Sequence, residues 1–265
     1  MSHTLGYTVN CSLLFTELPV NERPQAARDA GFHAVEFWWP FETATPEQAE
    51  IDAFVTALDN AGVRLSGLNF FAGQLPGPDR GVLSHPSRTA EFLANTEVVA
   101  QIAERTGTTG FNALYGLRQD GVDPAEQDRL ALENTVAAAN AVAKVGGTVL
   151  VEPISGSDDY PLKTAAEGLA FVAKVREAGA ENVALLADFF HLAVNGDDVA
   201  AVVRDHAAEF GHIQIADAPG RGEPGTGELP IDELLTAAQA GGYRGLVGLE
   251  YKPTVPSAQS FGWLS

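Results

Sequence analysis

Short apolar segments alternate with longer amphipathic segments along nearly the whole chain. The apolar segments have the length of buried β-strands, and the amphipathic ones repeat their apolar residues with an α-helical period. We predict strands at residues 7–12, 34–37, 63–69, 110–114, 148–153, 183–188, 212–216 and 246–251. We predict helices at residues 19–30, 46–60, 87–106, 124–145, 162–178, 197–208 and 231–240.

Repeated strand–helix units of this kind predict parallel strands joined by right-handed crossovers. Eight such units close into a barrel, so we predict an α/β protein with a single-domain (β/α)8 TIM barrel over residues 1–265. An open doubly wound sheet would show a glycine-rich turn after its first strand, whereas residues 10–15 read NCSLLF. No linker or shift in composition divides the chain. The last helix, within residues 254–265, is expected to be short or irregular.

The fifth to eighth predicted strands each carry a polar residue near the carboxyl end, where barrels of this type place their active sites. These residues are Glu152, Asp188, Gln214 and Glu250. Three carboxylates buried together need a counter-charge, and the nearest basic residues in sequence are Arg221 and Lys252. A divalent cation resolves this conflict, and oxygen ligands suit Mg²⁺ or Mn²⁺. We therefore predict a metal site at this mouth.

Two polar loops are candidates for carrying function. Residues 211–228, GHIQIADAPGRGEPGTGE, predict a short strand followed by a loop rich in glycine and proline. Such a loop carries functional side chains when a scaffold holds it. Residues 70–86 form a second loop, longer than a compact domain usually leaves without a role.

Several further residues are candidates around this mouth. His191 follows Asp188 by three positions and could hold a substrate oxygen, whereas His212 is expected in the core. Asp158 and Asp217 are expected to be solvated loop acids. Polar residues that could line a pocket are Asn10, Glu36, Asn69 and Asn112. Aromatic residues that either wall the pocket or pack the helices are Trp38, Trp39, Phe41, Phe70 and Phe71.

The charge balance excludes several classes of partner. The chain has 35 acidic and 16 basic residues, a formal net charge of −19. Such a field repels nucleic acid and anionic membrane surfaces. Neither an export signal nor a membrane-spanning run is evident, so we expect a cytoplasmic protein. The single cysteine, Cys11, excludes an intrachain disulfide and is expected to be a small core residue.

Longer segments are similar to a known family. The runs HIQIADAPGRGEPGTGEL and GYRGLVGLEYKPT, with NCSLLFTE, GFHAVEFWWPFE, FNALYG and VEPIS, resemble the hydroxypyruvate isomerases among the xylose isomerase-like TIM barrels. Gln214 stands where the related ketose 3-epimerases usually place a histidine, which favours the hydroxypyruvate isomerase branch. The chain departs from the family pattern at residues 68–71 and 74–85, where substrate would contact the mouth.

The resemblance implies a function and a set of site residues. The implied reaction interconverts hydroxypyruvate and tartronate semialdehyde (2-hydroxy-3-oxopropanoate) by proton transfer through an enediolate. Four ligands would hold the divalent metal ion, namely Glu152, Asp188, Gln214 and Glu250. Glu152 and Glu250 would form the acid/base pair. The expected substrate-binding residues are His191, Arg221, Asn69 and Lys252.

Alternative functions stay open at this point. A 2-oxo-tetronate isomerase, or a sugar isomerase or 3-epimerase, could use the same scaffold on a longer substrate. A phosphodiesterase of the endonuclease IV type shares the barrel but needs several clustered histidines, and the six here are poorly placed. A non-catalytic sugar-binding barrel is a remote alternative. The expected partner is a small keto acid or ketose, and the aromatic loops after the second and third strands could support a homo-oligomer.

Overall fold

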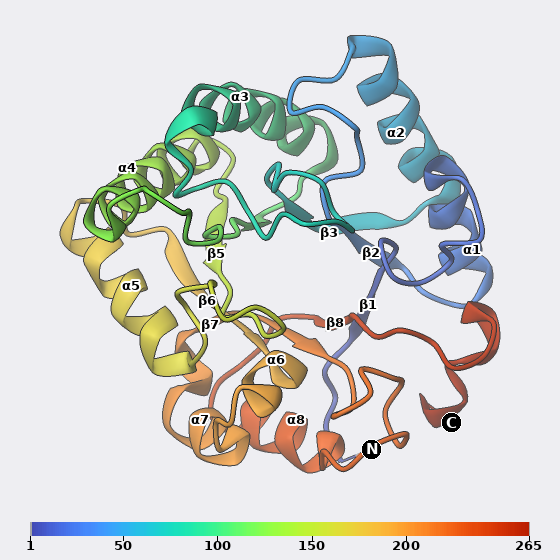
Figure 1. Ribbon diagram of the computed structural model, residues 1–265. Helices are drawn as coiled ribbons and strands as arrows, with labels where there is room; N and C mark the ends of the chain where they lie inside the picture. The colour runs from blue at the N-terminus through green and yellow to red at the C-terminus, as the bar shows by residue number, and fades with distance from the viewer. Residues whose placement is uncertain (1, 265) are drawn as a thin grey trace.

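The computed structural model describes residues 2–264 as a closed barrel of eight parallel strands ringed by helices (Figure 1). The strands are β1 (Tyr7–Asn10), β2 (Ala34–Phe37), β3 (Arg64–Asn69), β4 (Gly110–Asn112), β5 (Thr148–Val151), β6 (Val183–Asp188), β7 (Phe210–Ile215) and β8 (Val247–Leu249). Each strand pairs with the next, and β1 pairs with β8 from Tyr7↔Val247 to Val9↔Leu249, which closes the barrel. The predicted α/β class and TIM barrel are confirmed.

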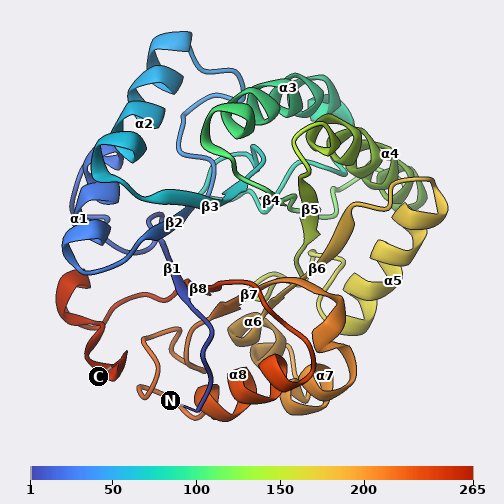
Figure 2. The same ribbon diagram turned by 180° about the vertical axis from the view of Figure 1, so that it is seen from behind.

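The α-helices other than α6 lie around the outside of the barrel, and α6 lies closer to the strand ends, as both views show (Figures 1 and 2). The α-helices are α1 (Arg23–Asp29), α2 (Gln48–Ala61), α3 (Thr89–Thr106), α4 (Pro124–Ala143), α5 (Ala165–Glu177), α6 (Phe189–Val194), α7 (Val199–His206) and α8 (Ile231–Ala240). Short 3-10 helices lie at Val20–Glu22, Pro86–Arg88, Ala207–Glu209, Ser257–Gln259 and Gly262–Leu264. No helix within residues 2–264 is long and apolar enough to span a bilayer.

The helix α6 is the one α-helix that the sequence pattern did not predict. It begins directly after β6 because the Asp188 side chain caps it, accepting hydrogen bonds from the backbone amides of Phe190 and His191 at 2.8 and 3.3 Å. Its six residues are too few to show a helical period. The helix expected at residues 197–208 is the shorter α7 with the 3-10 turn that follows it. After β8 the described chain has only 3-10 turns, as expected.

Apolar side chains fill the layer between strands and helices. Helix α2 places Ile51, Phe54 and Leu58 on its buried face, at helical spacing. The ring of Phe54 contacts Phe37 of β2 edge-on, with ring centroids 5.2 Å apart. Cys11 is fully buried directly after β1, as predicted for a small core residue. This packing holds the strand ends, and therefore the polar residues on them, in fixed positions.

The long loop of residues 70–86 is fastened to the segment that follows β4. The amide of Gly116 donates to the carbonyl of Arg80 at 3.1 Å, and the amide of Ser84 donates to that of Tyr115 at 2.9 Å. Gly81 has a φ of +106°, and a Cβ at this position would lie 2.1 Å from the carbonyl oxygen of Leu114. Only glycine permits this close approach. The loop is thus held at the barrel mouth.

Candidate active site

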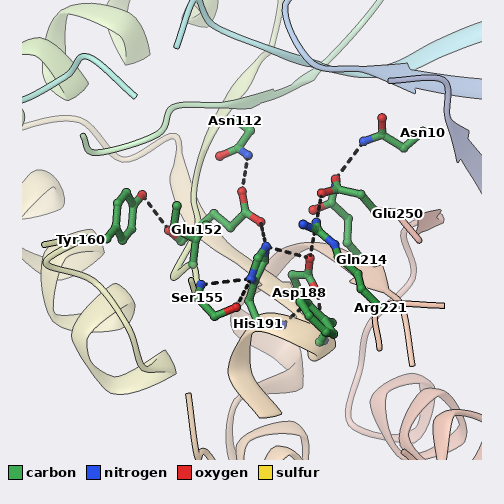
Figure 3. Close-up of polar contacts among 12 residues, drawn as sticks. Asn10, Asn112, Glu152, Ser155, Tyr160, Asp188, His191, Gln214, Arg221 and Glu250 are labelled. Carbon is green, nitrogen blue, oxygen red and sulfur yellow. Dashed lines mark hydrogen bonds and ion pairs between the residues drawn. The ribbon is translucent and has the colours of Figure 1, made fainter. Parts of the chain in front are cut away.

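Three carboxylates converge at the carboxyl ends of the strands. Glu152 directly follows β5, Asp188 ends β6, and Glu250 directly follows β8. Together with His191 of α6 they offer one ligand atom each, and these atoms lie within 4.8 Å of one another. All four residues are buried, and Figure 3 shows them facing one another. The barrel therefore concentrates negative charge where such folds place their chemistry.

Amide groups hold each carboxylate in place. Asn112 of β4 donates to Oε2 of Glu152 at 2.6 Å, and Asn10 of β1 donates to Oε2 of Glu250 at 2.8 Å (Figure 3). The Asp188 Oδ1 atom is occupied by capping α6. Asn10 and Asn112 were expected only as polar interruptions of a lined pocket. Here they fix the rotamers of the two glutamates.

Three side-chain oxygen atoms at this mouth are buried without a hydrogen-bond partner. They are Oδ1 of Asn112 on β4, Oδ2 of Asp188 and Oε1 of Gln214 on β7. An unpaired buried oxygen is costly, so such atoms indicate a missing partner. A divalent cation would satisfy the oxygens of Asp188 and Gln214 together with the two buried glutamates. The four residues predicted as ligands therefore offer oxygen donors at one mouth, a donor set that fits Mg²⁺ or Mn²⁺.

Burial raises the pKa values of all three acids. For Glu152, burial and then the charge of Asp188 raise the pKa to about 8. For Asp188, burial raises the pKa to about 6, although Arg221 opposes the shift. For Glu250, burial raises the pKa well above its ordinary range against the opposing charge of Arg221. One arginine is therefore not enough to keep three acids ionised, which is the electrostatic reason to expect a cation.

His191 is held as a neutral hydrogen-bond donor. Its Nδ1 atom lies 3.0 Å from the backbone nitrogen of Ser155, and an amide N–H can only donate. Nδ1 is therefore the acceptor, and the ring proton lies on Nε2. Nε2 is 3.9 Å from Oε1 of Glu152 and 3.7 Å from Oδ2 of Asp188. Burial, followed by the charge of Arg221, holds the pKa of the imidazole well below its usual range. This state suits the predicted contact with a substrate oxygen.

Arg221 lines the mouth, and its guanidinium lies against two of the acids. Its Nη2 atom donates to Oε1 of Glu250 at 2.5 Å and lies 3.7 Å from Oδ2 of Asp188. The guanidinium carbon also stacks over the Phe190 ring, 5.2 Å from its centroid. The sequence predicted that Arg221 would bind substrate. In this structure the guanidinium acts as the counter-charge of Glu250, and substrate binding by Arg221 stays a prediction.

The loop that carries Arg221 is organised by Asp217. This residue was expected to be solvated, and that expectation was wrong, because Asp217 is buried and accepts hydrogen bonds from the amides of Gly225, Gly227 and Leu229. Its backbone carbonyl accepts from Arg221 at 2.8 Å. Asp158, the other residue that was expected to be a solvated loop acid, is exposed as predicted. Asp217 thus converts a glycine-rich segment into a rigid support for the arginine.

A cavity of about 620 Å³ opens above the acids. Its lining includes all four predicted substrate-binding residues, which are Asn69 at the end of β3, His191 of α6, Arg221, and Lys252 after β8. It also includes Trp38, whereas Phe70 packs in the core against Phe92 and Phe111. Trp39, Phe41 and Phe71 line a neighbouring cavity of about 830 Å³.

Sequence reasoning missed one cationic residue of this cavity. Arg80 belongs to the loop of residues 70–86 and lines the cavity together with Gly77 of the same loop. Its Nη1 atom donates to the carbonyls of Gly77 and Asp79 at 2.7 Å each. Its charge contributes to the lowered pKa of His191, which places it within electrostatic reach of the acids. The unusual length of the loop was the only signal in the sequence.

Comparisons with known proteins agree with the barrel fold and identify the family. The family model of the xylose isomerase-like TIM barrel matches residues 24–265. The chain is 55% identical to "Putative hydroxypyruvate isomerase" of Streptomyces coelicolor, over 97% of this chain and 95% of that protein. It is 34% identical to 2-oxo-tetronate isomerase of Cupriavidus necator, over 97% and 96% of the two chains. The solved structure of AP endonuclease, family 2 from Brucella melitensis has a TM-score of 0.88 at 28% identity, over 98% of both chains.

Proposed function

This chain belongs to the xylose isomerase-like TIM barrel family, and we propose that it is a hydroxypyruvate isomerase. The proposal rests on the pair of buried glutamates, Glu152 and Glu250, which lie beside Asp188 at a mouth that also holds the unpartnered oxygens of Asp188 and Gln214. Relatives with the same family resemblance are named hydroxypyruvate isomerases, including one that is 29% identical, from Escherichia coli, over 98% of both chains. The reaction would interconvert hydroxypyruvate and tartronate semialdehyde.

Four side chains would hold a divalent cation, with Mg²⁺ or Mn²⁺ favoured by their oxygen atoms. They are Glu152, Asp188, Gln214 and Glu250. A cation bound there supplies positive charge that polarises the substrate carbonyl and stabilises an enediolate. The hydrogen bonds from Asn112 and Asn10 keep the two glutamates in place for this role.

The two glutamates would act as the general base and general acid of the proton transfer. One of them removes a proton from C3 of hydroxypyruvate, and the electron pair forms the C2–C3 double bond of the enediolate. A proton is then returned to C2, while the proton of the C3 hydroxyl is lost and the C2 oxygen gains one. The product has an aldehyde at C3 and a hydroxyl at C2, and because the hydrogens are only redistributed, no external oxidant or reductant is needed. Both glutamates are buried and held by amide donors, so each would be positioned to take up or return a carbon-bound proton.

His191 and Arg80 would orient the substrate. The Nε2–H of His191 faces the acids and can donate to a substrate oxygen as the charge on that oxygen grows. The cations that line the cavity are Arg80, Arg221 and Lys252. Because Arg221 is engaged by Glu250, we assign the substrate carboxylate to Arg80, with Lys252 as a second cation. These local charges would attract an anionic keto acid despite the net charge of −19.

The second candidate function is 2-oxo-tetronate isomerisation. It is favoured by the 34% identical relative and by the volume of about 620 Å³, which leaves room beside a three-carbon acid. A 3-epimerase or a sugar-binding barrel has less support, because the solved D-psicose 3-epimerase, at 21% identity and a TM-score of 0.73, shows the fold alone. The acid cluster contains one histidine among the described residues, which gives no support to a phosphodiesterase with a histidine-rich metal cluster.

A product assay on a panel of substrates tests the proposal. The purified protein, supplied with Mg²⁺ or Mn²⁺, is incubated with hydroxypyruvate, 2-oxo-tetronate or a ketose. We expect the highest kcat/KM for hydroxypyruvate. A higher kcat/KM for 2-oxo-tetronate would favour the second candidate, and saturable binding without turnover would overturn both.

A further inference from the structure

Glu36 is a buried acid that the proposed mechanism does not use. It lies on β2, inside the barrel, and its two oxygens contact side chains of β1 and β7. Oε1 accepts from Nε2 of Gln214 at 2.7 Å and from Nδ2 of Asn10 at 3.2 Å. Oε2 lies 2.7 Å from Nε2 of His212. His212, expected in the core, is thus half-buried and pairs with an acid.

The contact with Gln214 decides which end of the amide faces the acid cluster. A glutamine amide has one end that donates and one that accepts, and only its oxygen can bind a cation. Because Oε1 of Glu36 accepts two N–H groups, the NH2 end of Gln214 must face it. The oxygen end is left over, and it is the buried oxygen that lacks a partner.

We propose that Glu36 is a positioning residue that fixes the orientation of the Gln214 amide and so presents its oxygen to the cation. This inference rests on the proposed cation site but not on the identity of the substrate. Oriented ligands of this kind lose affinity when the group behind them is changed, even though that group never touches the metal.

Glu36 also reaches a second member of the site. The Nδ2 atom of Asn10 donates to Oε1 of Glu36 and also to Oε2 of Glu250, the latter at 2.8 Å. One carboxylate thereby orders two of the four expected ligands. His212 engages the other oxygen of Glu36 and limits its rotation. The polar chain from His212 through Glu36 to Gln214 spans the barrel interior beneath the acid cluster.

The backbone leaves room for this arrangement. A Cβ on Gly248 of β8 would lie 2.6 Å from Oε1 of Glu36 and 2.8 Å from Cγ of Gln214. A Cβ on Gly67 of β3 would lie 3.3 Å from Cβ of Glu36. The adjacent strand β3 and the strand β8, which pairs with β1 and β7, therefore carry glycine where the Glu36 side chain needs the space.

The test measures Mn²⁺ binding to metal-free protein by calorimetry, without substrate. In Glu36→Gln the introduced amide can donate as well as accept, so the Gln214 amide is no longer held one way. We expect Mn²⁺ affinity to fall about 10- to 100-fold while circular dichroism shows the barrel intact. The matched control is Ser66→Ala, because Ser66 lies in the same barrel interior and bonds Thr8 and the carbonyl of Val35. The Mn²⁺ affinity of Ser66→Ala should stay within about twofold of that of the unmodified protein.

A double variant separates orientation from general damage. Glu36→Gln combined with Gln214→Glu places at position 214 a carboxylate, which offers oxygen at both ends and needs no orientation. We expect it to recover most of the lost affinity and thereby to show that Glu36→Gln is not merely misfolded. Unchanged affinity in Glu36→Gln, an equal loss in Ser66→Ala, or no recovery in the double variant would overturn the proposal. Mn²⁺ binding without isomerase activity in the unmodified protein would remove only the proposed function.

Discussion

The Nη2 atom of Arg221 lies 2.5 Å from Oε1 of Glu250, so a cation of the chain itself neutralises one of the clustered acids. The same nitrogen is 3.7 Å from Oδ2 of Asp188. A single guanidinium serves two acids and leaves Glu152 without a basic partner of comparable proximity among the described residues. The electrostatic balance of the site is therefore incomplete in the protein alone. That imbalance is the physical basis for the cation in the proposed reaction.

Removing either proposed acid/base residue should abolish turnover and leave the fold intact. We expect Glu152→Gln and Glu250→Gln each to lower kcat by about 10²- to 10⁴-fold, the usual contribution of a positioned base. The amide keeps the shape of the side chain but cannot accept a carbon-bound proton. Steady-state kinetics, with Glu104→Gln on the exposed face of α3 as control, checks this. Full activity in either variant would remove that residue from the chemistry.

Metal removal should make stability depend on pH in a defined direction. In the folded protein the pKa of Glu152 is raised to about 8 from an ordinary 4.5, so its stabilising contribution is complete below 4.5 and is lost as the pH rises through 8. We therefore expect the free energy of unfolding of the metal-free protein to fall as the pH rises across this window. Saturating Mn²⁺ should reduce the fall, because a cation favours the ionised acids. Denaturant unfolding with and without chelator measures both slopes, and a metal-free stability that rises with pH would contradict the account.

Arg80 should determine affinity for anionic substrates. We expect Arg80→Gln to raise KM for hydroxypyruvate about tenfold or more, because a charge-assisted hydrogen bond to the carboxylate is lost. Deuterium exchange into dihydroxyacetone, which lacks a carboxylate, should change little. An equal loss on both compounds would show that Arg80 acts through the structure of its loop instead.

Gly248→Ala should damage the metal site from within the barrel. The added methyl would overlap Oε1 of Glu36 and press on Gln214. We expect weaker Mn²⁺ binding and a loss of about 1–3 kcal/mol in the free energy of unfolding, the usual cost of overpacking. The control is Gly262→Ala, where an added Cβ meets no atom within 4 Å. Unaltered Mn²⁺ affinity in Gly248→Ala would argue against the close packing of these side chains.

Much of the fold was predictable because it depends on local periodicity. Strand β6 and helix α8 begin and end where the apolar pattern predicts them. The polar residues at the carboxyl ends of consecutive strands were also readable, because parallel strands bring those ends to one mouth. Glu152, Asp188 and Glu250 converge for that reason.

The remaining features depend on contacts between distant parts of the chain. Glu36 and His212 are 176 residues apart and meet only because β2 and β7 both face the barrel interior. Asp217 was expected to be a solvated acid. The groups that it binds are backbone amides, which the pattern of side chains along the sequence does not reveal. Arg80 became part of the cavity through the backbone contacts of Gly81 and Gly116, which no local pattern indicates.

The most direct test of the central claim is the path of the transferred proton. Hydroxypyruvate is incubated with the protein in deuterated water and followed by NMR, with Mn²⁺ or Mg²⁺ removed by chelator and then restored. We expect deuterium at C3 of recovered hydroxypyruvate and at C2 of tartronate semialdehyde. The label should be lost with chelator, regained with metal, and absent in Glu152→Gln and Glu250→Gln. Product formed at an undiminished rate in chelator, or formed without deuterium from solvent, would contradict the central claim.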